Sequence, residues 1–257
     1  MKNIIDTHVH LEEIENLQEV LDNAIQSGIT SVVAVGSDHK SNLKILELAD
    51  KIKTLKIYPA LGIHPTNIVK EEIETTLRFI EDNIKKIIAI GEIGLDYWYK
   101  SNNKEIQNIQ LQNEVFELQL ALSKKYSKPV IIHSRGAWQE CYEITKSKNI
   151  QKAVFHWYSG PVEILKKIIQ DGYMVSATPA LEYSVHHIQA IEQSPIENIL
   201  VETDTPVRYK TKNGESYISQ PRDVLRTIKA LSLIKNLSDE NTAEITLSNA
   251  IKFFNLT

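Results

Sequence analysis

The sequence predicts an α/β fold, a (β/α)8 TIM-like barrel that forms a single domain over residues 1–257. Two observations lead to this prediction. Short apolar runs alternate with longer amphipathic stretches along the whole chain, and a length of 257 residues is usual for such a barrel built in one piece. The composition, 42% hydrophobic and 24% charged, supplies enough apolar residues for the core of a globular protein.

The apolar runs have the length and the Ile and Val content of strands that are buried on both faces. The eight predicted strands are Asn3–Thr7, Ser31–Val35, Lys56–Leu61, Ile87–Gly91, Pro129–Ile132, Ala153–Phe155, Tyr173–Ser176 and Asn198–Val201. Strands that alternate with helices favour a parallel sheet with helices outside it. A closed barrel is the favoured arrangement of that sheet, and an open doubly wound sheet is the alternative.

Apolar residues between the predicted strands recur at helical spacing, for example from Leu17 to Ile25 and from Leu43 to Ile52. Two further helices are expected near the C-terminus, over 221–235 and 239–253, with Ser238 and Asn241 at the start of the second. The polar stretch 98–110 is expected to be a loop or the approach to the fourth helix, and a second polar stretch, 209–219, is expected to be a loop.

Charge and cysteine content limit the classes of function. The net charge of −4 is not that of a typical nucleic-acid binder, although bound divalent cations would reverse the field inside a site. Cys141 is the only cysteine, which excludes an intramolecular disulfide framework and favours the cytoplasm. No apolar run approaches the roughly 18 to 20 residues that span a bilayer. We therefore expect neither a membrane association nor an obligate protein partner.

Residue types that bind metals follow five of the eight predicted strands. They are His8 and His10 after the first strand, Glu92 after the fourth, His133 after the fifth, His156 after the sixth and Asp204 after the eighth. The carboxyl ends of barrel strands meet at one mouth, and residues i and i+2 of a strand share a face. Imidazole nitrogens and carboxylate oxygens suit zinc, manganese or a similar ion. Six such residues exceed the needs of one tetrahedral ion, so we expect two ions that share a carboxylate, Glu92 or Asp204.

These segments resemble those of TatD-type hydrolases of the amidohydrolase superfamily. The matching segments are IDTHVHL at 5–11, LGIHP at 61–65, GEIGLDY at 91–97, PVIIHSRGA at 129–137, FHWYSG at 155–160 and ETDTP at 202–206. The resemblance implies a (β/α)8-type barrel and a deoxyribonuclease, often described as a 3′-to-5′ exonuclease, with two divalent ions (zinc, magnesium or manganese). It further implies that His8, His10 and Asp204 hold one ion, that His133 and His156 hold the other, and that Glu92 bridges them.

The sequence departs from the family pattern in two segments where substrate would be held. After ETDTP the family usually has a basic loop and an Asn-x-Pro element, whereas this chain reads VRYKTKNGESYISQP, with Ser219-Gln220-Pro221 in that place. The stretch WYKSNNKEIQN at 98–108 also differs from the commoner form. Both departures leave the metal-ligand set intact and put the substrate preference in question.

Several residues around the predicted mouth are open to two interpretations. His64 is expected to contact a substrate phosphate or to move a proton, or else it caps the turn at Pro65. Arg135 either grips a phosphate or pairs with a neighbouring acid. Glu202 either orients a ligand or pairs with a cation, and Asp96 either orients a histidine or caps the loop that follows. The remaining open cases are a basic path of Arg208, Lys210 and Lys212, which is otherwise a solvated face, and the aromatic residues Tyr97, Trp98, Tyr99, Trp157 and Tyr158, which either stack on bases or pack the rim.

The favoured function is phosphodiester hydrolysis with DNA as substrate, with catalytic roles for Asp204, Glu92 and His64 and substrate contacts from His64, Arg135 and Arg208. Asp204 is the candidate general base, and His64 is one candidate for protonating the leaving group. A small-molecule amidohydrolase that cleaves an amide, lactone or phosphoester is the alternative, because the metal ligands alone permit it. A non-catalytic metal-binding module is the third possibility. His39, His186 and His187 are expected at the surface, and Cys141 is expected to pack in a helix.

Overall fold

Eight parallel strands follow one another around a barrel in chain order in the computed structural model, which describes residues 3–98 and 109–256. The strands are β1 (Ile4–Val9), β2 (Ile29–Val35), β3 (Lys56–Leu61), β4 (Ala89–Gly94), β5 (Val130–His133), β6 (Ala153–Phe155), β7 (Met174–Ala177) and β8 (Ile199–Val201). The first and last strands meet through a parallel bridge between Val9 and Thr205, where the His10 amide donates to the Thr205 carbonyl at 2.8 Å. The barrel prediction is confirmed, and the open sheet is not formed.

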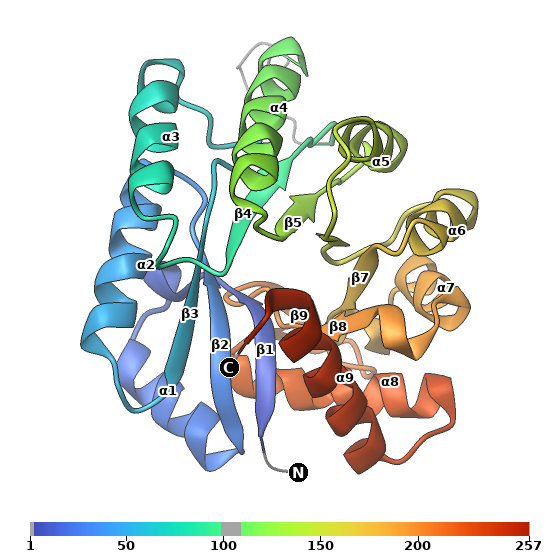
Figure 1. Ribbon diagram of the computed structural model, residues 1–257. Coiled ribbons are helices and arrows are strands. Elements are labelled where there is room, and N and C mark those ends of the chain that lie inside the picture. Colours follow the sequence, from blue (N-terminus) through green and yellow to red (C-terminus); the bar gives the residue numbers. More distant parts are fainter. Residues whose placement is uncertain (1–2, 99–108, 257) are drawn as a thin grey trace.

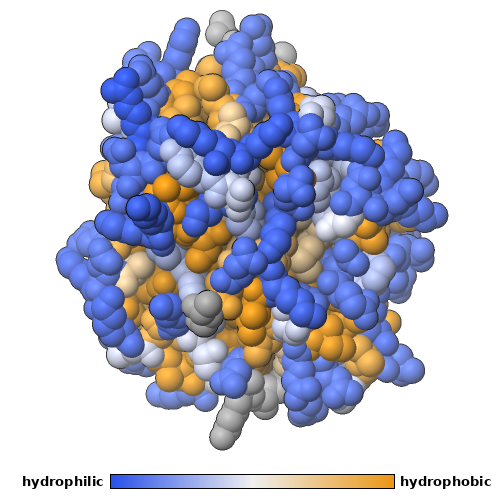
Figure 2. Space-filling view, viewed as in Figure 1, coloured by the Kyte–Doolittle hydropathy of each residue, from blue (hydrophilic) through white to orange (hydrophobic). Residues whose placement is uncertain are grey.

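Helices surround the strands, and each covers the outer face of the barrel (Figure 1). They are α1 (Leu17–Gln26), α2 (His39–Lys51), α3 (Ile73–Asp82), α4 (Ile109–Tyr126), α5 (Trp138–Ser147), α6 (Val162–Gln170), α7 (Val185–Gln193) and α8 (Val224–Lys235). Local sequence sets their starts: for example, the Asp38 side chain accepts from the Ser41 amide in a capping box at the start of α2. Hydrophilic side chains cover much of the face in Figure 2, with apolar residues visible between them.

The last helix, α9 (Asp239–Phe254), helps to enclose the barrel interior. Ser238 accepts from the Asn241 amide and so begins α9, as the sequence predicts. Phe253 and Phe254 belong to one apolar cluster with inward-facing residues of the strands. Those strand residues are Ile5, Val33, Val35, Ala60, Ala89, Ile131, Val154, Met174 and Leu200. This apolar cluster fills the interior of the barrel. Polar residues are therefore left to the mouth of the barrel, at the carboxyl ends of the strands.

Three expectations from the sequence are wrong or only partly met. The predicted loop 209–219 contains a hairpin of β9 (Arg208–Lys210) and β10 (Ser216–Ile218), stabilised by tertiary packing because Tyr209 is fully buried and donates to the Thr203 carbonyl. His187 is buried rather than exposed. His39 is partly buried against Phe79, whereas His186 is exposed as expected.

The other predicted loop, 98–110, falls largely outside the described residues. Within the described part of the chain, no helix has the length and hydropathy needed to cross a membrane.

His187 provides a test of this packing through the pH dependence of stability. Its Nδ1 donates to the Tyr158 carbonyl at 2.7 Å and its Nε2 accepts from the Thr178 amide at 3.1 Å, which together require the neutral ring. Burial lowers its pKa from 6.5 to about 4. The unfolded chain therefore binds the proton first, and stability is lost as pH falls from 6.5 towards 4, by about 3 kcal/mol in total.

We expect His187→Asn to reduce the slope of unfolding free energy against pH between pH 4 and 6.5. Urea unfolding followed by circular dichroism in EDTA measures that slope, and His186→Asn is the matched control because His186 is the exposed neighbour. An identical slope in His187→Asn and the parent protein would contradict the assignment.

Candidate metal centre

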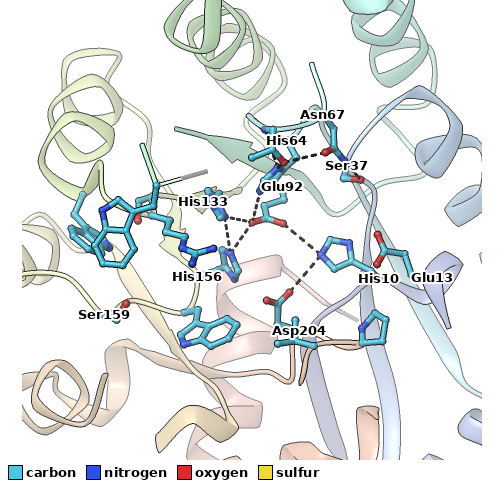
Figure 3. Close-up of a pocket in the computed structure, with 18 of the residues that line it drawn as sticks. His10, Glu13, Ser37, His64, Asn67, Glu92, His133, His156, Ser159 and Asp204 are labelled. Atoms are coloured by element: carbon cyan, nitrogen blue, oxygen red, sulfur yellow. Dashed lines mark hydrogen bonds and ion pairs between the residues drawn. The ribbon is translucent and has the colours of Figure 1, made fainter. Parts of the chain in front are cut away.

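Glu92 lies at the centre of a ring of imidazoles at the carboxyl ends of the strands (Figure 3). Its two oxygens divide these imidazoles into two groups. Oε1 lies 2.7 Å from His133 Nδ1, 2.7 Å from His156 Nε2 and 3.5 Å from His64 Nε2, while Oε2 lies 3.3 Å from His8 Nε2 and 3.6 Å from His10 Nε2. A carboxylate that faces a separate set of nitrogens with each oxygen has the arrangement of a bridging ligand.

Register shifts in two strands aim these side chains into the mouth. Between Asp6 and Val9, β1 advances three residues while β2 advances two. Between Ile90 and Ile93, β4 likewise gains one residue on β5. An extra residue breaks the in–out alternation of a strand. The shifts occur at His8 and at Glu92. Alternation along the strand therefore does not decide the direction of these two side chains, and both point into the mouth of the barrel.

Asp204 completes one side of the ring. Its Oδ1 lies 3.6 Å from His8 Nε2 and 3.5 Å from His10 Nε2, on the side of Glu92 Oε2. The residue has a φ of +50°, a left-handed conformation that is uncommon outside glycine and is concentrated at functional sites. Burial would raise the pKa of Asp204, but the hydrogen bond to His10 and the charges of His8 and His156 lower it to about 2.

Ionisation differs among the histidines. Burial opposes the charge of His10 and His156, yet the neighbouring carboxylates raise both pKa values well above 6.5. The pKa of Glu92 is correspondingly lowered well below 4.5, because the surrounding imidazoles outweigh its burial. His64 is the exception: burial dominates and lowers its pKa. The centre therefore stabilises positive charge next to Glu92 and Asp204, and His64 stays neutral beside it.

The outer nitrogens of three histidines are held by oxygen acceptors. His10 Nδ1 donates to the Val35 carbonyl at 3.1 Å, His133 Nε2 to Asp96 Oδ2 at 2.8 Å, and His156 Nδ1 to Glu202 Oε1 at 3.3 Å. When such a ring loses its proton, these outer bonds keep the remaining hydrogen on the outer nitrogen, so the inner nitrogen that faces Glu92 is free to bind an ion. The inner nitrogens also lie close in pairs, His8 with His10 at 3.3 Å and His133 with His156 at 3.4 Å. Such converging lone pairs fit divalent ions.

Asp96 and Glu202 hold other groups as well as the histidines. Asp96 Oδ1 accepts from the Trp98 amide at 2.8 Å, so both interpretations of this residue are realised. Glu202 Oε1 also accepts from the Trp157 amide at 3.0 Å, and no Lys or Arg is paired with Glu202 in the described part of the chain. Glu202 therefore lies where an orienting carboxylate is needed, behind His156.

Four groups of three side chains place their donor atoms close enough together to hold an ion. These groups contain every predicted ligand except Asp204, and they also contain Glu202, His64, Glu12 and Glu13. The groups are His8, His10 and Glu92; His64, Glu92 and His133; His8, His156 and Glu202; and His10, Glu12 and Glu13. Glu12 is not among the predicted ligands because it lies beyond the strand end, in a short 3-10 helix (Leu11–Glu13). Its burial raises its pKa from 4.5 to about 7, and the proximity of two acids to the His-x-His pair was the available signal.

A pocket of about 680 Å³ opens over this centre. Of the predicted substrate contacts, His64 and Arg135 line it, whereas Arg208 and Lys210 are exposed on β9 and do not. Trp98, Trp157 and Trp138 also line it, and Trp138 was not singled out in the sequence. Tyr158 instead packs in the interior and donates to the Pro161 carbonyl. Tyr99 lies outside the described residues, and Cys141 is buried in α5 as predicted.

Comparison with known proteins gives one consistent result. Residues 5–255 match the model of the family described as TatD related DNase. An uncharacterized metal-dependent hydrolase of Methanocaldococcus jannaschii is 31% identical over 97% of this chain and 96% of that protein. The human protein named deoxyribonuclease TATDN3 is 26% identical over 98% of this chain and 94% of its own length.

Solved structures show the same fold. The crystal structure of YJJV, a TatD homologue from Escherichia coli, superimposes with a TM-score of 0.88 at 24% identity and covers 99% of this chain and 98% of its own. A phosphotriesterase homology protein from Escherichia coli, crystallised with phosphate in its active site, superimposes with a TM-score of 0.68 at 13% identity, over 98% of this chain and 99% of its own.

Proposed function

The chain belongs to the TatD-related DNase family and is a metal-dependent hydrolase, and from this premise we propose that it hydrolyses phosphodiester bonds of DNA from a strand end. The division of five imidazoles between the two oxygens of Glu92 carries the proposal, because it supports two metal positions side by side. Closely spaced ion pairs are typical of enzymes that cleave phosphate esters.

Each position has a ligand set in this proposal. His8, His10 and Asp204 would hold one ion, His133 and His156 would hold the other, and Glu92 would be shared between them. Zinc, manganese and magnesium are the candidate ions, and the imidazole-rich set favours the first two. Ions held there would polarise a phosphoryl oxygen and lower the pKa of bound water.

Proton transfer is assigned to two residues of the chain. Asp204 is the general base in this proposal, because it is ionised at neutral pH and faces the pocket. His64 lies beside Glu92, and its Nδ1 is 2.7 Å from the hydroxyl of Thr66. A neutral imidazole held in this way can donate a hydrogen bond to a phosphate oxygen or to the leaving group. Arg135, exposed at the pocket, is the candidate contact for a neighbouring phosphate.

A small-molecule hydrolase is the second candidate, and the size of the pocket favours it. A pocket of about 680 Å³ with Arg135 as the single Lys or Arg in its described lining is within the range of small-ligand sites. The same observation favours attack at a strand end over binding along a duplex, because duplex binding relies on several phosphate contacts.

The test uses protein stripped with EDTA and reloaded separately with zinc, manganese or magnesium. Single-stranded DNA labelled at either the 5′ or the 3′ end is incubated with each form. We expect metal-dependent shortening from one end and no cleavage by the stripped protein. If every loaded form left both single- and double-stranded DNA intact, the proposal would be wrong. Hydrolysis of small phosphoesters, amides or lactones under those conditions would then support the second candidate.

A further inference from the structure

All three tryptophans of the chain line the pocket. Trp98 follows β4, Trp138 begins α5, and Trp157 follows β6 and the ligand His156. The strand order places β4, β5 and β6 next to one another. The indoles therefore gather along one side of the mouth, next to the side of the metal centre that holds His133 and His156.

Two glycines let two of these indoles lie directly against the backbone. A Cβ at Gly136 would be 2.3 Å from Trp98 Cδ1, and a Cβ at Gly160 would be 2.5 Å from Trp138 Cγ. Gly136 also has a φ of +75°, which disfavours any other residue. Each of the two rings therefore packs against the backbone of a loop, Trp98 against the loop after β5 and Trp138 against the loop after β6, which restricts the positions that the rings can take.

The first two indoles form an open aromatic corner. The ring centroids of Trp98 and Trp138 are 5.7 Å apart and their planes meet at 83°. The Arg135 guanidinium lies 5.8 Å from the Trp98 ring. Trp98 nevertheless remains 59% exposed, which is unusual for so large an apolar side chain. An edge-to-face pair with this much free surface presents a ring face to a ligand.

The backbone of Trp157 is held by residues next to the metal centre, and its ring centroid lies 5.2 Å from that of Tyr209. The φ of Trp157, +42°, is left-handed, and its amide donates to Glu202 Oε1 at 3.0 Å and to Ser176 Oγ at 2.9 Å. Glu202 also contacts His156. A ligand that binds the metal centre through a phosphate would thus have this indole at a fixed position beside it.

We propose that Trp98, Trp138 and Trp157 form a stacking subsite for unpaired nucleobases, an inference that rests on the proposed nuclease function. The charge of the pocket supports it: Arg135 is the single Lys or Arg of its described lining, so contacts between basic side chains and phosphates provide little affinity. Indoles stack on any base, which gives binding without sequence preference. A duplex keeps its base faces stacked internally, so the subsite takes bases at single-stranded ends.

Intrinsic fluorescence tests the subsite without any cleavage, because every tryptophan of the chain lines the pocket. EDTA-treated protein is titrated with (dT)4 and with a tetramer of abasic sugar phosphates that has the same charge. We expect (dT)4 to quench the emission and to bind more tightly, and Trp98→Ala to weaken (dT)4 binding about tenfold, with Trp98→Phe close to the parent protein. Affinity for the abasic tetramer should be unchanged in both variants.

The matched control is Leu233→Ala, which removes a side chain 62% exposed on α8 and away from the pocket. Equal affinity of the parent protein for the two tetramers, absence of quenching by (dT)4, or unchanged (dT)4 affinity in both Trp98→Ala and Trp138→Ala would overturn the inference.

Cleavage separates this inference from the proposed function. With metal present, we expect the parent protein to cleave a single strand with a base at the terminal nucleotide faster than one with an abasic terminus, and Trp98→Ala to remove most of that difference. Equal rates on both strands would overturn the stacking subsite and leave the nuclease intact. If no DNA were cleaved, the proposed function would fail, and the fluorescence titration would still decide whether bases bind.

Discussion

Glu92→Gln is expected to lower the metal content of the loaded protein and to reduce hydrolysis by more than about a hundredfold. Removal of a residue that only supports a metal ligand can already cost about that much, and Glu92 is proposed as a ligand itself. The substitution keeps the volume of the side chain but replaces one of two anionic oxygens by an amide. Oε1 faces His133, His156 and His64, and Oε2 faces His8 and His10. An amide therefore leaves one of these two groups without its anionic partner.

Metal content per chain, measured by mass spectrometry after loading and desalting, is the primary readout. Activity on the same preparation is the second. Glu19→Gln is the matched control, because Glu19 is exposed on α1 and does not line the pocket. Full metal content together with full activity in Glu92→Gln would refute a bridging role for Glu92.

Asp204→Asn is expected to behave differently, with a kcat lowered by about 10² to 10⁴ and a metal content close to that of the parent protein. The asparagine retains an oxygen that can face His8 and His10, but it cannot accept a proton. The pKa of Asp204 is about 2, below its ordinary value, so the carboxylate stays ionised as pH falls and is lost only near pH 2. Activity of the parent protein should therefore show no acid limb from this group above about pH 4.

Steady-state kinetics separate the two roles of Asp204. A lowered kcat with little change in KM indicates proton transfer, whereas loss of metal along with activity would assign the residue to ligation alone. Unchanged kcat would exclude it as the base. Asp50→Asn, an exposed residue of α2, provides the matched control for removal of one carboxylate.

Much of this protein follows from the sequence because the relevant signals are local. The runs of Ile and Val predict all eight strands to within a few residues, and the alternation with helices predicts their order in the barrel. The ligand types at the strand ends, from His8 to Asp204, converge because the carboxyl ends of parallel strands in a barrel necessarily share one mouth. The family match covers residues 5–255, a range that includes these strand ends.

Tertiary structure decided what depends on contacts between residues far apart in the chain. Strand pairing sets the register shifts that turn His8 and Glu92 inward, and no periodicity within one strand encodes them. Glu202 reaches His156 across 46 positions of sequence, and Trp98 rests on Gly136 of another loop. Burial of His187 and the placement of Arg208 outside the pocket have the same cause. Packing between distant segments fixes a side chain's environment, whereas sequence patterns describe only its neighbours along the chain.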